Sequence, residues 1–188
     1  MPLTTLDPRT ALVVIDLQAG LLGIEGKPYA LDDVLTRNAE LADAFREHSL
    51  PVVLVNVTGT TGVRTDANPS GEARELPEEV TVLAPELGEP DLAVTKRTHG
   101  AFTGTDLEAY LRKEGITQVV VTGVSTSVGV AATVQHAFEL GFHVSVPVDA
   151  VTDSEEESHH FTVTTALPKR AETGTTAELL ELLAATHP

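Results

Sequence analysis

The chain has 188 residues, enough for one domain with a full hydrophobic core. Its formal net charge of −16 argues against a nucleic-acid partner and against binding to an anionic membrane surface. The sequence contains no cysteine, which excludes disulfides, thiolate metal sites and cysteine nucleophiles. We therefore expect a single domain over residues 1–188. Its acidity indicates either plain solubility or a specific basic partner.

No apolar run reaches the length that a bilayer-spanning helix needs. The first residues, 1–7, lack the basic start and apolar centre of a signal peptide. A cytoplasmic location is the expectation that follows.

Strands and helices are expected to alternate along the chain. Branched apolar runs predict strands, and apolar residues at helical spacing predict helices. The expected strands cover 11–15, 52–57, 91–96, 119–121 and 142–146, with a short edge strand between 168 and 174; the expected helices cover 31–48, 105–115 and 128–140, and two more start near 154 and 175. This alternation predicts a three-layer, doubly wound α/β sheet, mainly parallel, of about six strands.

Two of the helix starts carry the spacing of a capping box. Thr105 precedes Glu108 by three residues, and Ser154 precedes Glu157 by three. In such a box, the hydroxyl and the carboxylate each accept a backbone N–H of the first turn. We therefore expect a side-chain cap at both positions.

The segment 58–90 has no clear periodicity and is punctuated by glycine and proline. A connection of that length is often a lid or a substrate wall. Its two cationic residues, Arg64 and Arg74, either serve such a role or are solvated loop charges.

Polar residues follow three of the predicted strands. They are Asp16, Lys96 and the turn Ser125-Thr126-Ser127. The carboxyl ends of parallel strands share one edge of a sheet, so these groups can converge there. An acid–base pair beside free backbone N–H groups of residues 125–129 suits acyl transfer or another acid-catalysed cleavage. The alternative is that Asp16 caps a turn and Lys96 is its surface partner.

Other polar residues are weaker candidates. Gln18 either reaches the pocket beside Asp16 or is exposed, and His99 either lines the pocket or is an ordinary loop histidine. Adjacent His159 and His160 lack helical ligand spacing, so no metal site is expected. Ser125 resembles the serine of a nucleophile elbow, but the closing glycine is missing.

Several motifs, in order, resemble the isochorismatase-like hydrolase family, whose members are also called cysteine hydrolases. The matching pieces are Val13-Val14-Ile15-Asp16-Leu17-Gln18, Val94-Thr95-Lys96-Arg97 with Ala101-Phe102, Val121-Thr122-Gly123-Val124-Ser125-Thr126-Ser127-Val128-Gly129-Val130, Ala137-Phe138-Glu139-Leu140-Gly141 and Val148-Asp149-Ala150. The resemblance covers nearly the whole chain. It implies a site between the ends of strands one, three and four, and a non-proline cis peptide at Val124-Ser125.

The resemblance also assigns roles to individual residues. It implies catalytic positions at Asp16, Lys96 and Gly129. Together with the candidates above, it predicts a substrate site that includes Gln18, His99, Phe102, Val124, Ser125 and Ser127. No cofactor and no metal are expected, because the chain has Asn56-Val57-Thr58 where nicotinamidases have a metal-binding Asp-x-His.

Gly129 is the main departure from the family, most of whose members have a nucleophilic cysteine at the matching position. Isochorismatases also have glycine there and cleave a vinyl ether without a covalent intermediate. By that resemblance Asp16 is a general acid, which requires burial to outweigh the nearby Lys96. Ser125 and Ser127 stand where isochorismatases have an aromatic residue and a histidine.

The sequence therefore predicts a hydrolase that acts on a small organic molecule without a thiol, such as isochorismate or a related vinyl ether. The alternative is a catalytically silent relative that binds a small ligand or serves as an oligomeric scaffold. We expect a homo-oligomer, a dimer or a tetramer, with no nucleic-acid or membrane partner.

Overall fold

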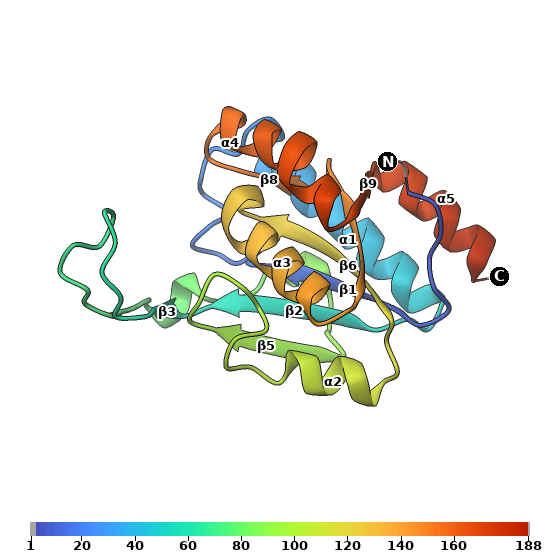
Figure 1. Cartoon of the computed structure of the whole chain (residues 1–188), viewed down its shortest axis with the longest axis horizontal. Helices are drawn as coiled ribbons and strands as arrows, with labels where there is room; N and C mark the ends of the chain where they lie inside the picture. Colours follow the sequence, from blue (N-terminus) through green and yellow to red (C-terminus); the bar gives the residue numbers. More distant parts are fainter. Residues whose placement is uncertain (1–2, 188) are drawn as a thin grey trace.

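A seven-stranded sheet forms the centre of the fold in the computed structural model, which describes residues 3–187 (Figure 1). Its order is β5-β2-β1-β6-β7-β9, with β8 paired to β6, and every pairing in it is parallel. Its strands are β1 (Thr10–Ile15), β2 (Val52–Val57), β5 (Leu92–Lys96), β6 (Gln118–Val124), β7 (His143–Pro147), β8 (Val151–Thr152) and β9 (Glu172–Gly174). The predicted mainly parallel sheet is confirmed, and the seventh strand is the two-residue β8, which is too short to leave a sequence pattern.

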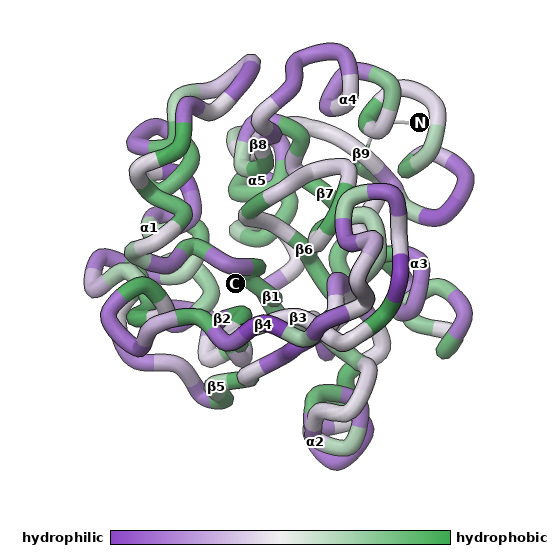
Figure 2. The backbone as a smooth tube through the Cα atoms, turned by 90° about the vertical axis from the view of Figure 1, so that its left-hand side faces the viewer, coloured by the Kyte–Doolittle hydropathy of each residue, from purple (hydrophilic) through white to green (hydrophobic). Residues whose placement is uncertain are grey.

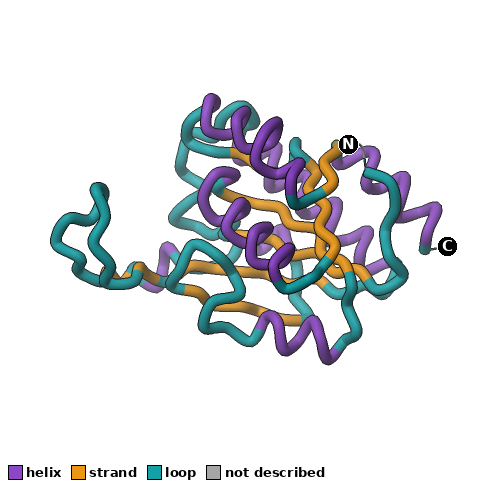
Figure 3. The backbone as a smooth tube through the Cα atoms, viewed as in Figure 1, coloured by secondary structure: helices purple, strands orange, loops and turns teal. Residues whose placement is uncertain are grey.

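Helices cover both faces of this sheet, which gives the predicted three layers (Figure 3). The α-helices of the described residues are α1 (Leu31–Glu47), α2 (Leu107–Lys113), α3 (Ala131–Glu139), α4 (Glu156–Phe161) and α5 (Thr176–Thr186). Helices α1 and α5 pack on one face, while α2, α3 and the segment that follows α4 pack on the other. None of the helices described in residues 3–187 is long and apolar enough to cross a membrane.

Strand β1 lies at the centre of the sheet and contributes to both hydrophobic cores. Leu12 and Val14 face the α1 side, whereas Ala11, Val13 and Ile15 face the α3 side, and all five are buried. The strands near the middle of the molecule are accordingly coloured hydrophobic in Figure 2. A strand that is buried on both faces needs apolar residues at every position, which is why β1 is recognisable from its sequence.

A thin arm projects from the body at the edge where β2 ends (Figure 1). It begins and ends with the antiparallel pair β3 (Gly59–Thr60) and β4 (Arg74–Glu75). Arg97, which follows β5, forms an ion pair with Glu75 and ties the base of the arm to the sheet. The short 3-10 helices η1 (Glu78–Val80) and η2 (Pro85–Leu87) complete the connection. A lid function of this segment stays a prediction.

The two expected capping boxes are wrong. The Thr105 hydroxyl donates to the Ala101 carbonyl, and α2 begins later with Asp106 as an N-cap that makes no side-chain bond. Helix α4 begins at Glu156, and its N-cap residue Glu155 also makes no side-chain bond. A capping box does form at the start of α5, where Thr175 and Glu178 exchange the expected bonds.

Gly123 is the glycine at which an added side chain would make the closest contact with neighbouring backbone. Its φ is +102°, and a Cβ there would lie 2.0 Å from the Ile15 carbonyl oxygen of the neighbouring strand. We expect Gly123→Ala to lower the free energy of unfolding by about 3 kcal/mol or more, because a strained φ adds to a clash with buried backbone. Urea denaturation measures the change.

Gly104→Ala is the matched control for that substitution. Gly104 also has a positive φ of +70°, but a Cβ there would have no neighbour within 4 Å. The free energy of unfolding should fall by only about 1 kcal/mol, the cost of holding a residue with a Cβ at a positive φ. Equal losses at the two glycines would contradict the close packing of β6 against β1.

Candidate functional site

Asp16 and Lys96 meet at the edge of the sheet where β1 and β5 end. The two strands are not neighbours, because β2 lies between them. Asp16 directly follows β1 with a φ of +55°, and Lys96 is the last residue of β5. The Lys96 Nζ donates to Asp16 Oδ2 at 2.7 Å and to the Thr98 carbonyl oxygen at 3.1 Å. Their predicted convergence is confirmed, and neither is a surface residue, with exposed fractions of 5% and 3%.

The Asp16 carboxyl group has an unusual protonation equilibrium. Burial raises the pKa of Asp16 to about 6, although the charge and hydrogen bond of Lys96 act in the opposite direction. Only Oδ2 contacts Lys96, and the buried Oδ1 has no hydrogen-bond partner among residues 3–187. Asp16 therefore combines a pKa near neutrality with one oxygen that is uncommitted within the described structure.

Gly129 lies against this carboxyl group. A Cβ placed on Gly129 would be 3.4 Å from Asp16 Oδ2, 3.0 Å from Ile15 Cγ2 and 3.1 Å from the Val124 carbonyl oxygen. There is room for a small side chain if its neighbours give by a few tenths of an ångström. The structure thus brings Asp16, Lys96 and Gly129 together.

Two residues from the segment after β7 hold the turn that connects β6 to α3. The Val124-Ser125 peptide bond is cis, as the resemblance implies, and residues Thr126–Val130 form the π-helical turn η3. Asp153 Oδ2 accepts the Ser127 N–H at 2.7 Å, and His159 Nδ1 lies 2.9 Å from the Thr126 hydroxyl oxygen. Burial lowers the pKa of His159, which favours the neutral ring in this contact.

Sequence reasoning did not assign Asp153 and His159 to the site. They stand 26 and 33 residues away from their partners in the turn. No local spacing connects them to it. The pairing of β8 with β6 brings this segment to the turn.

The predicted row of free backbone amides is shorter than expected. The N–H of Ser127 is used by Asp153, and those of Val128 and Val130 donate to the Ser125 carbonyl oxygen. The N–H groups of Ser125 and Thr126 donate to no other residue in the described range. Those two amides are therefore open to an anionic group.

Gln18 has its amide group engaged by the backbone. Its Oε1 accepts the Val57 N–H at 2.8 Å, and its Nε2 donates to the carbonyl oxygens of Val57 and Val80, each at 3.0 Å. The side chain is buried. Gln18 thus joins the end of β2 to the connection after the arm, rather than presenting a free amide to a pocket.

Two apolar candidates pack into the cores. Val124 is buried on the α1 side of the sheet. Phe102 stacks on Phe142, with 6.1 Å between the ring centroids, and packs against the core on the α3 side. A contact of either residue with substrate stays a prediction.

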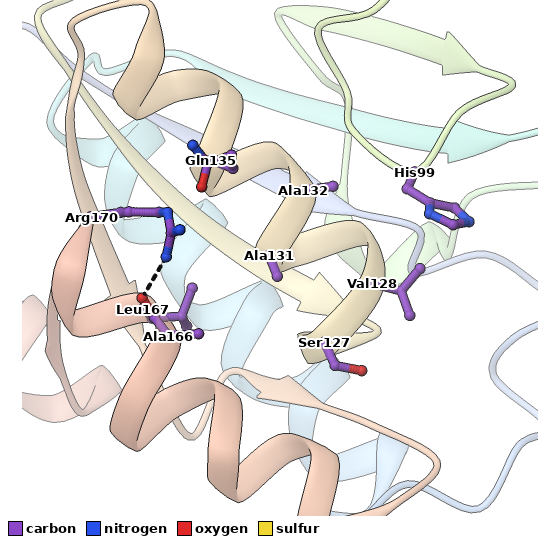
Figure 4. Close-up of a pocket in the computed structure, with 9 residues that line it drawn as sticks. All are labelled: His99, Ser127, Val128, Ala131, Ala132, Gln135, Ala166, Leu167 and Arg170. Atoms are coloured by element: carbon purple, nitrogen blue, oxygen red, sulfur yellow. Dashed lines mark hydrogen bonds between the residues drawn. The ribbon is translucent and has the colours of Figure 1, made fainter.

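His99 and Ser127 line a cavity of about 470 Å³ on the outer side of α3 (Figure 4). Its remaining lining residues come from η3, α3 and the segment after α4, and they are Val128, Ala131, Ala132, Gln135, Ala166, Leu167 and Arg170. Val130 and Val134 face the sheet, so this cavity lies on the side of α3 that points away from the sheet. Asp16, Lys96 and Gly129 are not among the residues that line it.

Within residues 3–187 no group of three acidic, histidine or cysteine side chains is placed to hold a metal ion. His159 is buried and its neighbour His160 is exposed, so they point to different surroundings.

Comparison with known proteins places this geometry in a family. The model of the isochorismatase domain matches residues 10–178. The uncharacterised isochorismatase family protein YecD of Escherichia coli O157:H7 is 37% identical over 180 residues, which cover 93% of this chain and 96% of YecD.

Two further proteins, one known by its sequence and one by its solved structure, are similar to this chain. Nicotinamidase 3 of Arabidopsis thaliana is 31% identical, over 84% of this chain and 81% of its own length. The solved structure of an isochorismatase family protein from Burkholderia thailandensis superimposes with a TM-score of 0.90 at 39% identity, and the match covers 96% of this chain and 98% of that one.

The ion pair itself yields a test. Replacing Lys96 by methionine keeps most of the side-chain volume but removes the charge and the hydrogen bond that lower the Asp16 pKa. We expect Lys96→Met to raise the pKa of Asp16 above its value of about 6. Carbon-13 NMR titration of the labelled carboxyl group measures it, and a pKa that falls instead would contradict the balance described here.

Proposed function

We propose a function from one premise: the chain belongs to the isochorismatase family. Members of this family are hydrolases, and the proposed activity is hydrolysis of a small organic molecule without a covalent enzyme intermediate. The chain has no cysteine, so a thioester cannot form on it. The observation that carries the proposal is the buried Asp16 carboxyl group, with a pKa of about 6 and an unpartnered Oδ1 in the described structure.

Asp16 acts as the general acid in the proposed reaction. Hydrolysis of a vinyl ether begins when a proton is added to the terminal carbon of the C=C bond, and the electron pair of that bond forms the new C–H bond. Water then adds to the resulting oxocarbenium ion and loses a proton, and the hemiketal collapses to a ketone and an alcohol. A carboxyl group with a pKa near the working pH is suited to the first step.

Lys96 supports the same cycle. Once Asp16 has donated its proton, the buried carboxylate needs a counter-charge, and the Lys96 ammonium already lies 2.7 Å from Oδ2. The uncommitted N–H groups of Ser125 and Thr126 are placed to bind a carboxylate or a developing negative charge on the substrate. Gly129 leaves space beside Asp16 at the position that the family resemblance assigns to a nucleophile.

A second candidate is a relative that binds a small ligand without turning it over. The near-complete burial of Asp16 and Lys96 favours it, as does the cavity of about 470 Å³, which is lined by neither residue. Turnover in a panel of vinyl ethers and amides separates the two candidates. If no compound is hydrolysed while one raises the melting temperature, the second candidate is supported.

Removal of the acid should abolish turnover. We expect the wild-type chain to release pyruvate from isochorismate or a related enolpyruvyl ether, and Asp16→Asn to reduce kcat by a factor of roughly 100 to 10,000. A coupled pyruvate assay measures the rate. Asp43→Asn, at an exposed position on α1, is the control and should keep full activity. Retained activity in a folded Asp16→Asn variant would exclude the proposed acid.

The pH dependence has a defined sign. Asp16 donates only when protonated, so kcat/KM should fall about tenfold per pH unit above the pKa of about 6. A pH-rate profile on the best substrate measures it. An activity that rises through this range would instead indicate that the carboxylate is a general base.

Gly129→Cys tests whether the site can accept thiol chemistry. A Cβ at this position meets Asp16 Oδ2 at 3.4 Å and nothing closer than 3.0 Å, so the variant should fold. We expect it to form a covalent adduct with an activated ester or amide, detectable by mass spectrometry, because the new thiol lies beside a potential base. Gly129→Ala controls for side-chain bulk. Absence of an adduct in the folded cysteine variant would contradict the assigned position.

A further inference from the structure

The cavity of about 470 Å³ on the outer side of α3 has the size of a small-molecule site. Such sites usually measure about 300 to 1,000 Å³. One wall is formed by η3 and α3, and the other by the end of η4 (Thr162–Ala166), the start of η5 (Leu167–Lys169) and the residue after it. Asp16 and Lys96 do not line the cavity, so a molecule bound in it would be separate from the proposed acid.

The two ends of this cavity are polar and its middle is apolar. Figure 4 shows Arg170 beside Gln135 at one end, and Ser127 and His99 toward the other. The wall between them carries only methyl groups, from Ala131 and Ala132. This order follows the helix, because positions 127, 131 and 135 succeed one another by about one turn each. The cavity therefore suits an elongated molecule with polar groups at both ends.

Arg170 supplies the positive charge at its end of the cavity. Its Nη1 donates to the Ala166 carbonyl oxygen at 3.0 Å, which holds the guanidinium in place. The N–H groups on Nη2 and Nε have no acceptor in the range 3–187, and Arg170 forms no ion pair there. Glu139, one turn beyond Gln135 on α3, accepts a hydrogen bond from Gln135 instead. Arg170 thus has donors to spare for the two oxygens of a carboxylate, which a guanidinium binds in parallel.

We propose that this cavity binds a small organic monocarboxylate with an apolar body. The carboxylate lies against Arg170, the body lies along Ala131 and Ala132, and a hydroxyl group at the far end bonds to Ser127 or His99. Within the described structure Arg170 is the one lysine or arginine that lines the cavity, which favours a single negative charge over a phosphate or a dicarboxylate. The proposal goes beyond the hydrolase activity and does not depend on it.

The overall charge of the chain makes such binding selective. A net charge of −16 repels anions at long range, so a carboxylate gains affinity only from donors that are presented to it locally. A neutral amide of the same shape fills the cavity equally well but cannot form the charged pair with Arg170. Comparing an acid with its amide therefore isolates the contact that the proposal requires.

Calorimetric titration of the full wild-type chain makes this comparison. The probes are 4-hydroxybenzoate, 4-hydroxyphenylacetate and 3-(4-hydroxyphenyl)propanoate, which differ in length, and the amide of each. We expect at least one acid to bind with a submillimolar dissociation constant. Its amide should bind more weakly by a factor of roughly 10 to 100, the usual value of a hydrogen bond to a charged group.

Arg170→Gln removes the charge at the half-buried end of the cavity. It should weaken binding of the acid by the same factor of roughly 10 to 100 and leave the amide unchanged, so that the two probes bind alike. Arg64→Gln, at an exposed position on the arm, is the matched control and should leave the affinity of both probes unchanged. Circular dichroism verifies that each variant folds.

Two further variants test where the probe binds. Ala132→Leu fills the middle of the cavity and should weaken both the acid and the amide at least tenfold, whether or not the Arg170 variant folds. Asp16→Asn should keep the affinity of the wild type, because Asp16 lies outside the cavity. These are binding measurements, so their outcome is independent of whether the chain hydrolyses any ether.

Absence of binding by all three acids at millimolar concentration would overturn the proposal. Equal affinities for an acid and its amide in the wild type would also overturn it, as would an acid that binds the folded Arg170→Gln variant undiminished. A loss in Asp16→Asn as large as that in Ala132→Leu would move the bound molecule to the Asp16 site and contradict a separate cavity site.

Discussion

The buried ion pair between Asp16 and Lys96 is the constraint around which the site is arranged. Parallel strands lie about 4.8 Å apart, so side chains at the ends of β1 and β5 must span the width of β2. The long lysine side chain covers that distance, and the positive φ of Asp16 turns its carboxyl group out of the strand to meet it. Burying one of these charges without the other would be strongly unfavourable. The strand order β5-β2-β1-β6 is therefore what allows both charges to be buried, because it brings the ends of β1 and β5 within reach of each other.

The turn after β6 depends on contacts from a distant part of the chain. Asp153 accepts the Ser127 N–H, and His159 contacts the Thr126 hydroxyl. Both residues follow β8, which pairs with the last residues of β6, whereas β7 pairs with its first residues. The position of Gly129 beside Asp16 is thus set jointly by β6, by the contacts of Asp153 and His159 with the turn, and by the close approach of Gly123 to β1.

The sequence predicts those parts of the fold that local chemistry determines. The branched apolar run of β1 and the acid after it suffice to place Asp16 at the sheet edge, because a central strand has no polar alternative. The capping boxes at Thr105 and Ser154 are wrong since a short hydroxyl has competing backbone partners nearby, which the Ala101 carbonyl illustrates. The backbone hydrogen bonds of the Gln18 amide, and the contacts of Asp153 and His159 with the turn after β6, are made with residues that are distant in the sequence. Such contacts leave no characteristic residue spacing in the sequence.

The chemistry that the site can support depends on which effect dominates at Asp16. In an enzyme with a thiol nucleophile, the aspartate must be ionised to accept the thiol proton, whereas a general acid must be protonated before it reacts. Here burial outweighs the neighbouring ammonium and moves the pKa upward to about 6. The chain also contains no thiol to deprotonate. A pKa near the working pH suits both acceptance and delivery of a proton, so it is the absence of a thiol that favours delivery, with Lys96 in place to stabilise the carboxylate that remains.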